Sequence, residues 1–290
     1  MNNQLQSKPK FSLAIQSDGY KKLINNTLGD SKRAAKFIAA ISSAVATNSS
    51  LQECDAGSIL SGALLGEALN LSPSPQLGQY YLVPFEQKKY NEKTKQYETI
   101  SKKAQFQLGY KGYIQLAIRS GQYKDIDVIE VREGEYLGRD KITGKHQFEF
   151  IEDEVERDNK SIIGYMAYFE YLNGFYKNLY WSKEKMQKHA LEYSQAYASD
   201  IKKKTNYSFW SKDFNGMAFK TMLRQLISKW GIMSIDMQEA LTKDMSVVKE
   251  DGTYDYVDNQ PVMETSGEEQ IEQVAETTTV EVQQVNINEL

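Results

Sequence analysis

The chain has 290 residues, 40% of them hydrophobic, and a formal net charge of −4 at pH 7. This composition can supply the core of one large domain with a tail, or of two domains. No segment approaches the roughly 20 apolar residues of a membrane helix, and the N-terminus MNNQLQSKPK lacks the apolar centre of a signal peptide, so we expect a soluble, intracellular protein.

The net charge hides a basic body joined to an acidic tail. Residues 246–290 contain eleven Asp and Glu and one basic residue, Lys249, which gives this segment a charge of −10. The other 245 residues contain 34 Lys and Arg against 28 Asp and Glu, a balance of +6. A basic body is compatible with a polyanionic ligand such as nucleic acid.

The first part of the chain is predicted to be helical after a polar arm at residues 1–30. Asp30 or Ser31 can cap a helix whose apolar residues recur at helical spacing as far as Val45. Asp55 can cap a second helix that runs to about Leu69. This helix is rich in Gly and Ala, which let another backbone approach closely.

Strands are predicted in the middle of the chain. Two prolines end the second helix, and QYYLVPF then begins a strand whose partner lies at about residues 97–108. A short helix is expected at 112–120. Asn173-Gly174 joins two aromatic-rich runs, and because both residues accept positive φ values we predict a hairpin with a type I′ turn. Further segments with strand character lie at 125–133, 146–152 and 161–171.

Two helices are predicted after the hairpin, at about 182–199 and 212–230. Strands clustered between helical parts indicate an α+β fold, with a central, mainly antiparallel β-sheet and hairpins packed with helices, after an N-terminal helical part. From Ser246 the chain has few large apolar groups, so it cannot offset its ordering entropy and we expect a disordered acidic tail. The predicted organisation is an arm at 1–30, a core at 31–245 and a tail at 246–290.

One basic window lies at residues 88–124, with nine Lys and Arg against two Glu. In the stretch FQLGYKGYIQLAIRSG, Lys111 precedes the predicted helix, between glycines that would let a phosphate approach the helix N-terminus. On that helix Gln115 and Arg119 share a face because they are four residues apart. The alternative is a polar surface helix with the flanking tyrosines in the core.

A second basic window, residues 201–230, holds seven Lys and Arg against Asp213. Its predicted helix buries an apolar stripe, and at the edge of this stripe Lys220 and Arg224 lie one turn apart, where a bound anion would relieve their repulsion. Cations, hydroxyls and rings precede the helix around Phe209. Binding of nucleic acid without base specificity needs cations along a backbone track and flat groups on which bases can lie, and both windows supply them.

Enzyme motifs are weak in this sequence. Gly138-x5-Gly144-Lys145-His146 is similar to a phosphate-binding loop, but it has one spacer residue too many and a strand-like segment follows it. The acidic residues 149–158 are better explained as a solvated strand end than as a metal cage. One cysteine and two histidines are too few for a disulfide or a Cys/His zinc site. We therefore expect no catalytic residue, no metal and no cofactor.

Three segments, taken together, resemble the RecT family of phage single-strand annealing proteins, which is distantly related to lambda Red Beta. They are CDAGSILSGALLGEALNLSPSPQLGQYYLVPF at 54–85, FQLGYKGYIQLAIRSGQY at 106–123 and WSKDFNGMAFKTMLRQLISKW at 210–230. The resemblance implies a β-β-β-α annealing core and ATP-independent pairing of complementary DNA strands during homologous recombination and repair, with no covalent chemistry. It also implies a homo-oligomeric ring or helical filament in the cytoplasm of a bacterial host.

The resemblance further implies the ligands and partners. These are single-stranded DNA, the annealed duplex, a partner exonuclease, and the host single-stranded-DNA-binding protein, which the tail would contact. Subunit assembly is expected to use the helix at 55–69 and the N-terminal helix. By position in the matching motifs, phosphate contacts are expected for Lys111, Arg119, Lys220 and Arg224. The other candidate DNA-binding residues are Lys102, Lys103, Gln107, Tyr110, Gln115, Phe209, Lys212, Asn215 and Thr221.

Three alternatives stay open at the level of sequence. One is a metal-dependent DNA nuclease, another is a scaffold that binds single-stranded DNA or RNA without annealing it, and the third is a structural phage protein that oligomerises without DNA. Every binding hypothesis depends on the expectation that the two basic windows, which are far apart in the sequence, meet on one surface.

Overall fold

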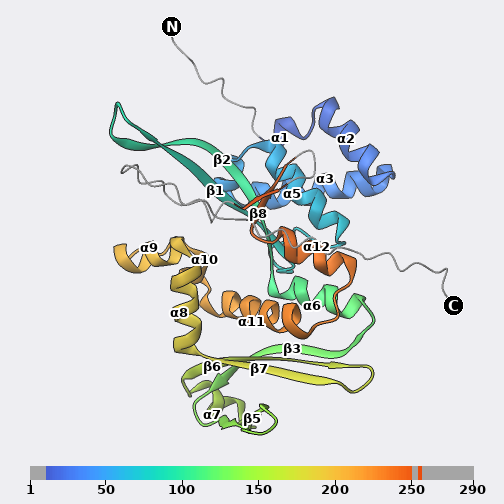
Figure 1. Cartoon of the computed structure of the whole chain (residues 1–290). Helices are drawn as coiled ribbons and strands as arrows, with labels where there is room; N and C mark the ends of the chain where they lie inside the picture. Colours follow the sequence, from blue (N-terminus) through green and yellow to red (C-terminus); the bar gives the residue numbers. More distant parts are fainter. Residues whose placement is uncertain (1–10, 250–253, 257–290) are drawn as a thin grey trace, which may run out of the picture. The chain divides into compact units, whose positions relative to one another are not determined.

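The computed structural model describes residues 11–249 and 254–256, which fall within one compact unit, and its helices and strands form an α+β fold (Figure 1). The helices are α1 (Phe11–Ala14), α2 (Asp18–Leu28), α3 (Ser31–Ala46), α4 (Ser49–Gln52), α5 (Ala56–Ala68), α6 (Tyr110–Arg119), α7 (Glu154–Asp158), α8 (Lys183–Tyr193), α9 (Gln195–Lys203), α10 (Phe209–Lys212), α11 (Phe214–Trp230) and α12 (Ile235–Lys243). The strands are β1 (Tyr80–Asn91), β2 (Gln96–Leu108), β3 (Tyr123–Arg132), β4 (Tyr136–Arg139), β5 (His146–Phe148), β6 (Ile162–Tyr171), β7 (Tyr176–Ser182), β8 (Ser246–Val248) and β9 (Tyr254–Tyr256).

The strands form three sheets in which every pair is antiparallel, as the sequence predicts. Their orders are β1-β2-β8-β9, β3-β6-β7 and β4-β5. In the second sheet, α11 packs against all three strands and also against α6. Tyr165 of β6 marks this face, since its ring lies 5.9 Å from that of Phe219 on α11. Three strands backed by one long helix agree with the implied β-β-β-α core.

The β1–β2 hairpin forms the first sheet together with two short strands, β8 and β9, from the C-terminal part of the body. Figure 1 shows its outer half extending away from the helices that pack at its base. At that base α5 covers one face, where Tyr80, Leu82 and Phe106 are buried. Ser58 of α5 joins the two elements, because its hydroxyl accepts a hydrogen bond from the amide of Ala104 at 2.9 Å.

The small residues of α5 are used by this packing. A Cβ on Gly62 would lie 2.8 Å from a methyl group of Leu82, and one on Gly66 would overlap the Tyr80 ring. Most of α5 is buried within the chain itself. The small-residue face that we expected to join subunits is therefore occupied by the protein's own hairpin.

The hairpin at Asn173-Gly174 is confirmed, but its turn is not type I′. Gly174 has a φ of +83°, whereas Asn173 is not among the residues with positive φ. The amide of Gly174 donates to the carbonyl of Tyr171 at 2.9 Å, and Phe175 donates to the Asn173 side chain at 3.0 Å. A loop in which only the glycine takes the left-handed conformation corresponds to a turn followed by a glycine bulge.

Several predicted boundaries change because side chains cap or break helices. The predicted helix at 182–199 divides at Ser194, which has extended backbone and caps α9 through its hydroxyl. Similarly, Asp213 separates α10 from α11 and accepts from the amide of Gly216. The acidic segment that we predicted as a strand end contains α7, whose N-terminus is capped by Asp153.

The body is also longer at both ends than predicted. The arm at 1–30 is folded from Phe11 onward into α1 and α2, with Phe11, Ile15 and Ile24 in the core. At the other end, the predicted boundary at residue 246 falls on β8, whose three residues are buried. Residues 250–253 and 257–290 of the predicted tail lie outside the described residues.

We predict that Gly66→Ala lowers the stability of the protein, although alanine normally favours a helix. The new methyl group must displace the buried Tyr80 ring, and overpacking of this kind costs about 1–3 kcal/mol. Urea unfolding measures the change. Gly19→Ala is the matched control, since a Cβ at Gly19 of α2 meets nothing within 4 Å. Equal stabilities for the two variants would contradict the packing described here.

Candidate nucleic-acid interface

The N-terminus of α6 is held against the chain just before β1. A Cβ on Gly109 or Gly112 would overlap the carbonyl oxygens of Gly78 and Gln79, respectively. The glycines around Tyr110-Lys111 are therefore required by contact with the protein's own backbone. Lys111 itself is exposed, and its ammonium nitrogen lies 5.9 Å from the centre of the Tyr110 ring.

The second basic window meets the first at this corner. Tyr81 of β1 lies beside the α6 N-terminus, because its hydroxyl and the Lys111 side chain both approach Gly78. The Phe209 ring of α10 lies 6.4 Å from the Tyr81 ring. Deeper in the structure, the rings of Tyr110 and Phe219 contact each other edge to face at 5.4 Å. The structure thus brings Lys111, Tyr110 and Phe209 together, as the convergence of the two windows requires.

A buried aspartate organises the predicted phosphate-binding pair on α11. Asp244 follows α12, and its side chain is fully buried. It accepts from Lys220 and Arg224, each at 2.8 Å, and also from the amide of Leu108 and the hydroxyl of Tyr113. Burial, and then the nearby carboxylate, raises the pKa of Tyr113 well above its ordinary value, so this hydroxyl stays a donor.

The two cations of this pair are not equally accessible. Lys220 is 6% exposed, whereas the side chain of Arg224 is 38% exposed. The anion that relieves their repulsion is Asp244, which is part of the protein. Lys220 is therefore in a structural position, while Arg224 keeps a surface from which a second anion can be reached.

Arg119 and Gln115 lie on the exposed side of α6, as their spacing predicts. The guanidinium of Arg119 donates to the carbonyls of Leu69 at 3.0 Å and Asn70 at 3.2 Å, at the C-terminus of α5. A cation is favourable there because the last carbonyls of a helix have no partner within it. Arg119 thus already has a structural role.

The candidate DNA-binding residues on β2 differ in their exposure and in the partners that they bind within the protein. Lys102 pairs with Glu53 and, at 3.1 Å, with Glu86, and hydrogen bonds to these carboxylates raise its pKa. Lys103 is half-buried. Gln107 is also half-buried, and it donates to a neighbouring glutamine of the same strand.

The α11 candidates other than the cations are used within the fold. Asn215 donates to Glu130 and accepts from the Tyr165 hydroxyl, both at 2.7 Å, and so joins α11 to β3 and β6. Thr221 is buried and donates to the carbonyl of Met217. Lys212 of α10, in contrast, is exposed.

A second buried aspartate, Asp200, shapes the loop before α10. Its carboxylate accepts from the hydroxyl groups of Thr205 and Ser211 and from the amides of Tyr207 and Ser208, at 2.6–3.0 Å. These hydrogen bonds, that from Thr205 first, hold the pKa of Asp200 well below its ordinary value. The loop therefore presents its outward residues on a fixed backbone.

Sequence reasoning missed three residues of this corner. Tyr81 had a usable signal, because strand alternation that buries Tyr80 turns Tyr81 to the opposite face. Asp244 and Asp200 had none. The partners of Asp244 lie on β2, α6 and α11, which sequence spacing does not relate, and those of Asp200 lie in the irregular loop and short helix that follow it, which have no periodic pattern.

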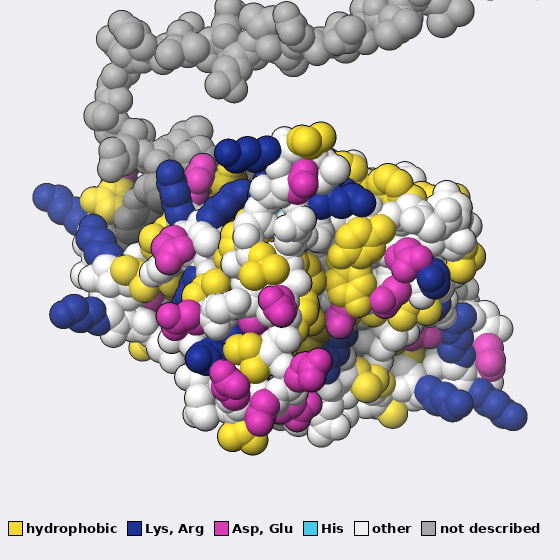
Figure 2. All heavy atoms as spheres, turned by 90° about the horizontal axis from the view of Figure 1, so that it is seen from below, with side chains coloured by type: hydrophobic (Ala, Val, Ile, Leu, Met, Phe, Trp, Pro, Cys, Tyr) yellow, Lys and Arg dark blue, Asp and Glu magenta, His cyan; other side chains and the backbone are white. Residues whose placement is uncertain are grey.

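The sheet face opposite α11 has a different character. Asp125 and Asp127 are exposed on β3, and Glu170, which lies opposite Asp125 on β6, forms an ion pair with Lys124 at 2.7 Å. Figure 2 shows acidic and hydrophobic side chains interspersed over the middle of the side seen from below in Figure 1, with basic side chains mostly around its margins. The two exposed aspartates disfavour a polyanion on this face, whereas the exposed candidate cations Lys111 and Lys212 lie at the Tyr81 corner.

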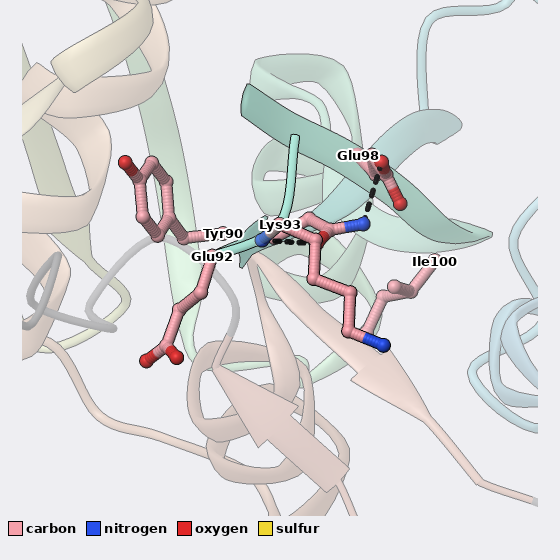
Figure 3. A pocket seen from close by; sticks show the side chains of 6 residues that line it. Tyr90, Glu92, Lys93, Glu98 and Ile100 are labelled. Atoms are coloured by element: carbon pink, nitrogen blue, oxygen red, sulfur yellow. Dashed lines mark hydrogen bonds between the residues drawn. The ribbon is translucent and has the colours of Figure 1, made fainter. Parts of the chain in front are cut away.

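Other features of the described residues bear on the alternative functions. The hollow at the β1–β2 tip, of about 440 Å³, is open and bordered by both acidic and basic side chains (Figure 3). The near-match to a phosphate loop continues into β5, so the required helix does not follow it. Within residues 11–249 and 254–256, no three His, Cys, Asp or Glu side chains gather as a metal site. Of the helices in these ranges, none combines the length and apolarity of a bilayer crossing.

Comparison with known proteins gives a family and two relatives. The model of the RecT family matches residues 35–264, which include β8 and β9. An uncharacterized protein of Bacillus subtilis strain 168, YqaK, is 38% identical over 227 residues, or 78% of this chain and 68% of that protein. Protein RecT of Escherichia coli strain K12 is 31% identical over 196 residues, or 67% of this chain and 65% of that protein. The matched region thus spans about two thirds of each relative.

We predict that Asp244→Asn destabilises the fold by about 3–5 kcal/mol, because it removes the charge of a buried carboxylate that forms ion pairs with Lys220 and Arg224. Asp236→Asn is the control, since that carboxylate is exposed on neighbouring α12 and its loss should cost no more than about 1 kcal/mol. Thermal and urea unfolding measure both. Similar losses for the two variants would show that Asp244 does not hold these elements together.

We also predict that Asp200→Asn flattens the acid limb of the stability curve. A carboxyl group with a depressed folded pKa stabilises the protein above its unfolded pKa of about 4, and this contribution is lost as the pH falls further. Wild-type stability should therefore fall more steeply below about pH 4 than that of Asp200→Asn. Urea unfolding at a series of pH values measures this, and parallel curves would contradict it.

Proposed function

The chain belongs to the RecT family, and we propose that it binds single-stranded DNA without base specificity and anneals complementary strands without ATP. Membership supports a role in single-strand annealing and recombination in general. The observation that carries the proposal is the corner at Tyr81, where Lys111 of the first basic window and Phe209 of the second lie beside the same ring.

The chemistry of this corner suits a protein that leaves sequence selection to base pairing. Such a protein must hold phosphates and sugars while the Watson–Crick edges stay open. Lys111 and Lys212 are exposed point charges, which contact phosphates without reading bases. Annealing then follows from a raised local concentration of two polyanions whose repulsion is offset by protein cations.

We assign the predicted DNA-binding residues to two roles. Lys111, Lys212 and the exposed part of Arg224 are the proposed phosphate contacts, and Lys103, Gln107 and Gln115 are weaker polar candidates. Lys220 is proposed to act through Asp244, since its ammonium is buried there. Arg119, Lys102, Asn215 and Thr221 already bind protein groups, so a DNA contact from any of them requires sharing that partner.

We further propose that the protein works as an oligomeric ring or filament in phage recombination, on strands exposed by a partner exonuclease. The proposed contact between the acidic tail and the host single-stranded-DNA-binding protein depends on residues beyond those described. These proposals are supported by family membership. The burial of α5 within the chain directs the search for subunit contacts to other surfaces.

Strand annealing in the absence of ATP is the decisive experiment. Labelled complementary oligonucleotides should pair faster with the protein than without it, and electron microscopy should show a ring or filament on the product. Incubation of labelled DNA with magnesium or manganese distinguishes the nuclease alternative, which requires shortened strands. Binding without faster pairing would instead identify a non-annealing scaffold.

We predict that Lys111→Ala weakens binding of unrelated single strands to a similar extent. Loss of one phosphate contact should lower the slope of log affinity against log salt concentration by about 0.7. Melting temperature should stay unchanged, because the side chain is exposed. Lys22→Ala, which removes an exposed charge on α2, is the control and should leave the slope as it is. Equal slopes for both variants would remove Lys111 from the interface.

A further inference from the structure

Three aromatic side chains are exposed around the corner where the basic windows meet. Tyr81 of β1 is 36% exposed, Phe209 of α10 is 39% exposed, and Tyr207 in the preceding loop is 78% exposed. The rings of Tyr81 and Phe209 lie 6.4 Å apart with an angle of 38° between their planes. They come from segments more than 120 residues apart in the sequence, so tertiary structure alone creates this pair.

These rings are held in place rather than left on a loose loop. The amides of Tyr207 and Ser208 both donate to the buried Asp200 carboxylate, at 3.0 and 2.7 Å. Ser208 then caps α10, which starts at Phe209. On the other side, Tyr81 belongs to a paired strand, opposite Gln107. A fixed backbone lowers the entropy lost when a ligand is bound by such rings.

The surroundings of the ring pair are cationic. The Lys111 side chain and the Tyr81 hydroxyl both approach Gly78, and Lys212 is exposed on the same short helix as Phe209. Asp213, the acidic neighbour, is occupied in capping α11, where it accepts from Gly216 at 2.9 Å. Burial, with smaller effects from Asp213 and Tyr110, raises the pKa of Tyr81, so its ring carries no charge that would repel a phosphate.

From this arrangement we infer that Tyr81 and Phe209 form a platform on which an unpaired nucleobase stacks while Lys111 holds an adjacent phosphate. Stacking on a ring is open to every base, because each has a π-face, and it leaves hydrogen-bonding edges free. Bases inside a duplex already stack on one another. The platform therefore favours single strands over duplex, in addition to the charge attraction that both share.

This inference rests on the proposed function, and its test separates phosphate contacts from base contacts. The probes are a single-stranded oligonucleotide, an abasic strand with the same number of phosphates, and the matching duplex. Wild-type protein should bind the normal strand more tightly than the abasic strand. Phe209→Leu and Tyr81→Leu should each lower the affinity for the normal strand at least about fivefold. This factor corresponds to the lower end of the range that stacking of one base contributes to binding. Both variants should leave the abasic and duplex affinities and the salt slope unchanged.

Two further variants control for damage to the fold. Phe209→Trp keeps a flat ring and should retain the preference for the normal strand. Phe175→Leu removes a phenylalanine of similar exposure, 47%, from the β6–β7 hairpin, and it should bind like wild type. The melting temperatures of all variants identify any that fail to fold. If either Tyr81→Leu or Phe209→Leu is unfolded, the other variant tests the platform.

The outcomes test the stacking platform and the proposed function separately. If wild type binds single strands and the leucine variants bind them equally well, the platform is overturned while the proposed function stands. The platform is also overturned if the variants lose affinity equally for normal and abasic strands, since the rings then act only through the fold. If wild type binds no single strand at all, the proposed function itself fails.

Discussion

The arrangement of the whole interface depends on one buried carboxylate. Asp244 accepts hydrogen bonds from the end of β2, from α6 and from two cations of α11. Its negative charge is tolerated in the interior only because these donors surround it. Since β2 and α6 carry the first basic window and α11 carries the second, this single group ties together the two segments that must lie near each other.

Two cations that bind Asp244 and look alike in the sequence differ in their burial. Lys220 and Arg224 are one helical turn apart, yet one is buried and neutralised while the other reaches the surface. Arg119 and Lys102 have likewise found partners within the protein. The number of cations in a basic window is therefore an upper limit on the positive charge that is available to a polyanion. Lys111 and Lys212 remain exposed, and both lie beside exposed rings.

Rings and charges at this corner have complementary tasks. Cations supply attraction that any polyanion shares, whereas flat rings respond to bases that have lost their stacking partners. The opposite face of the β3-β6-β7 sheet carries the exposed Asp125 and Asp127, which disfavour a polyanion there.

Local signals in the sequence determined much of the fold: the capping aspartates Asp30 and Asp55, the strand alternation in β1 and β2, the glycine turn after β6 and the apolar stripe of α11. They also indicated both basic windows and the family. Only the tertiary structure decided that α5 is buried against the β1–β2 hairpin, that Lys220 is buried, and that Tyr81 lies beside Phe209. The physical reason is that propensity, capping and periodicity act over a few residues, whereas burial and the pairing of charges depend on which distant segments pack against each other.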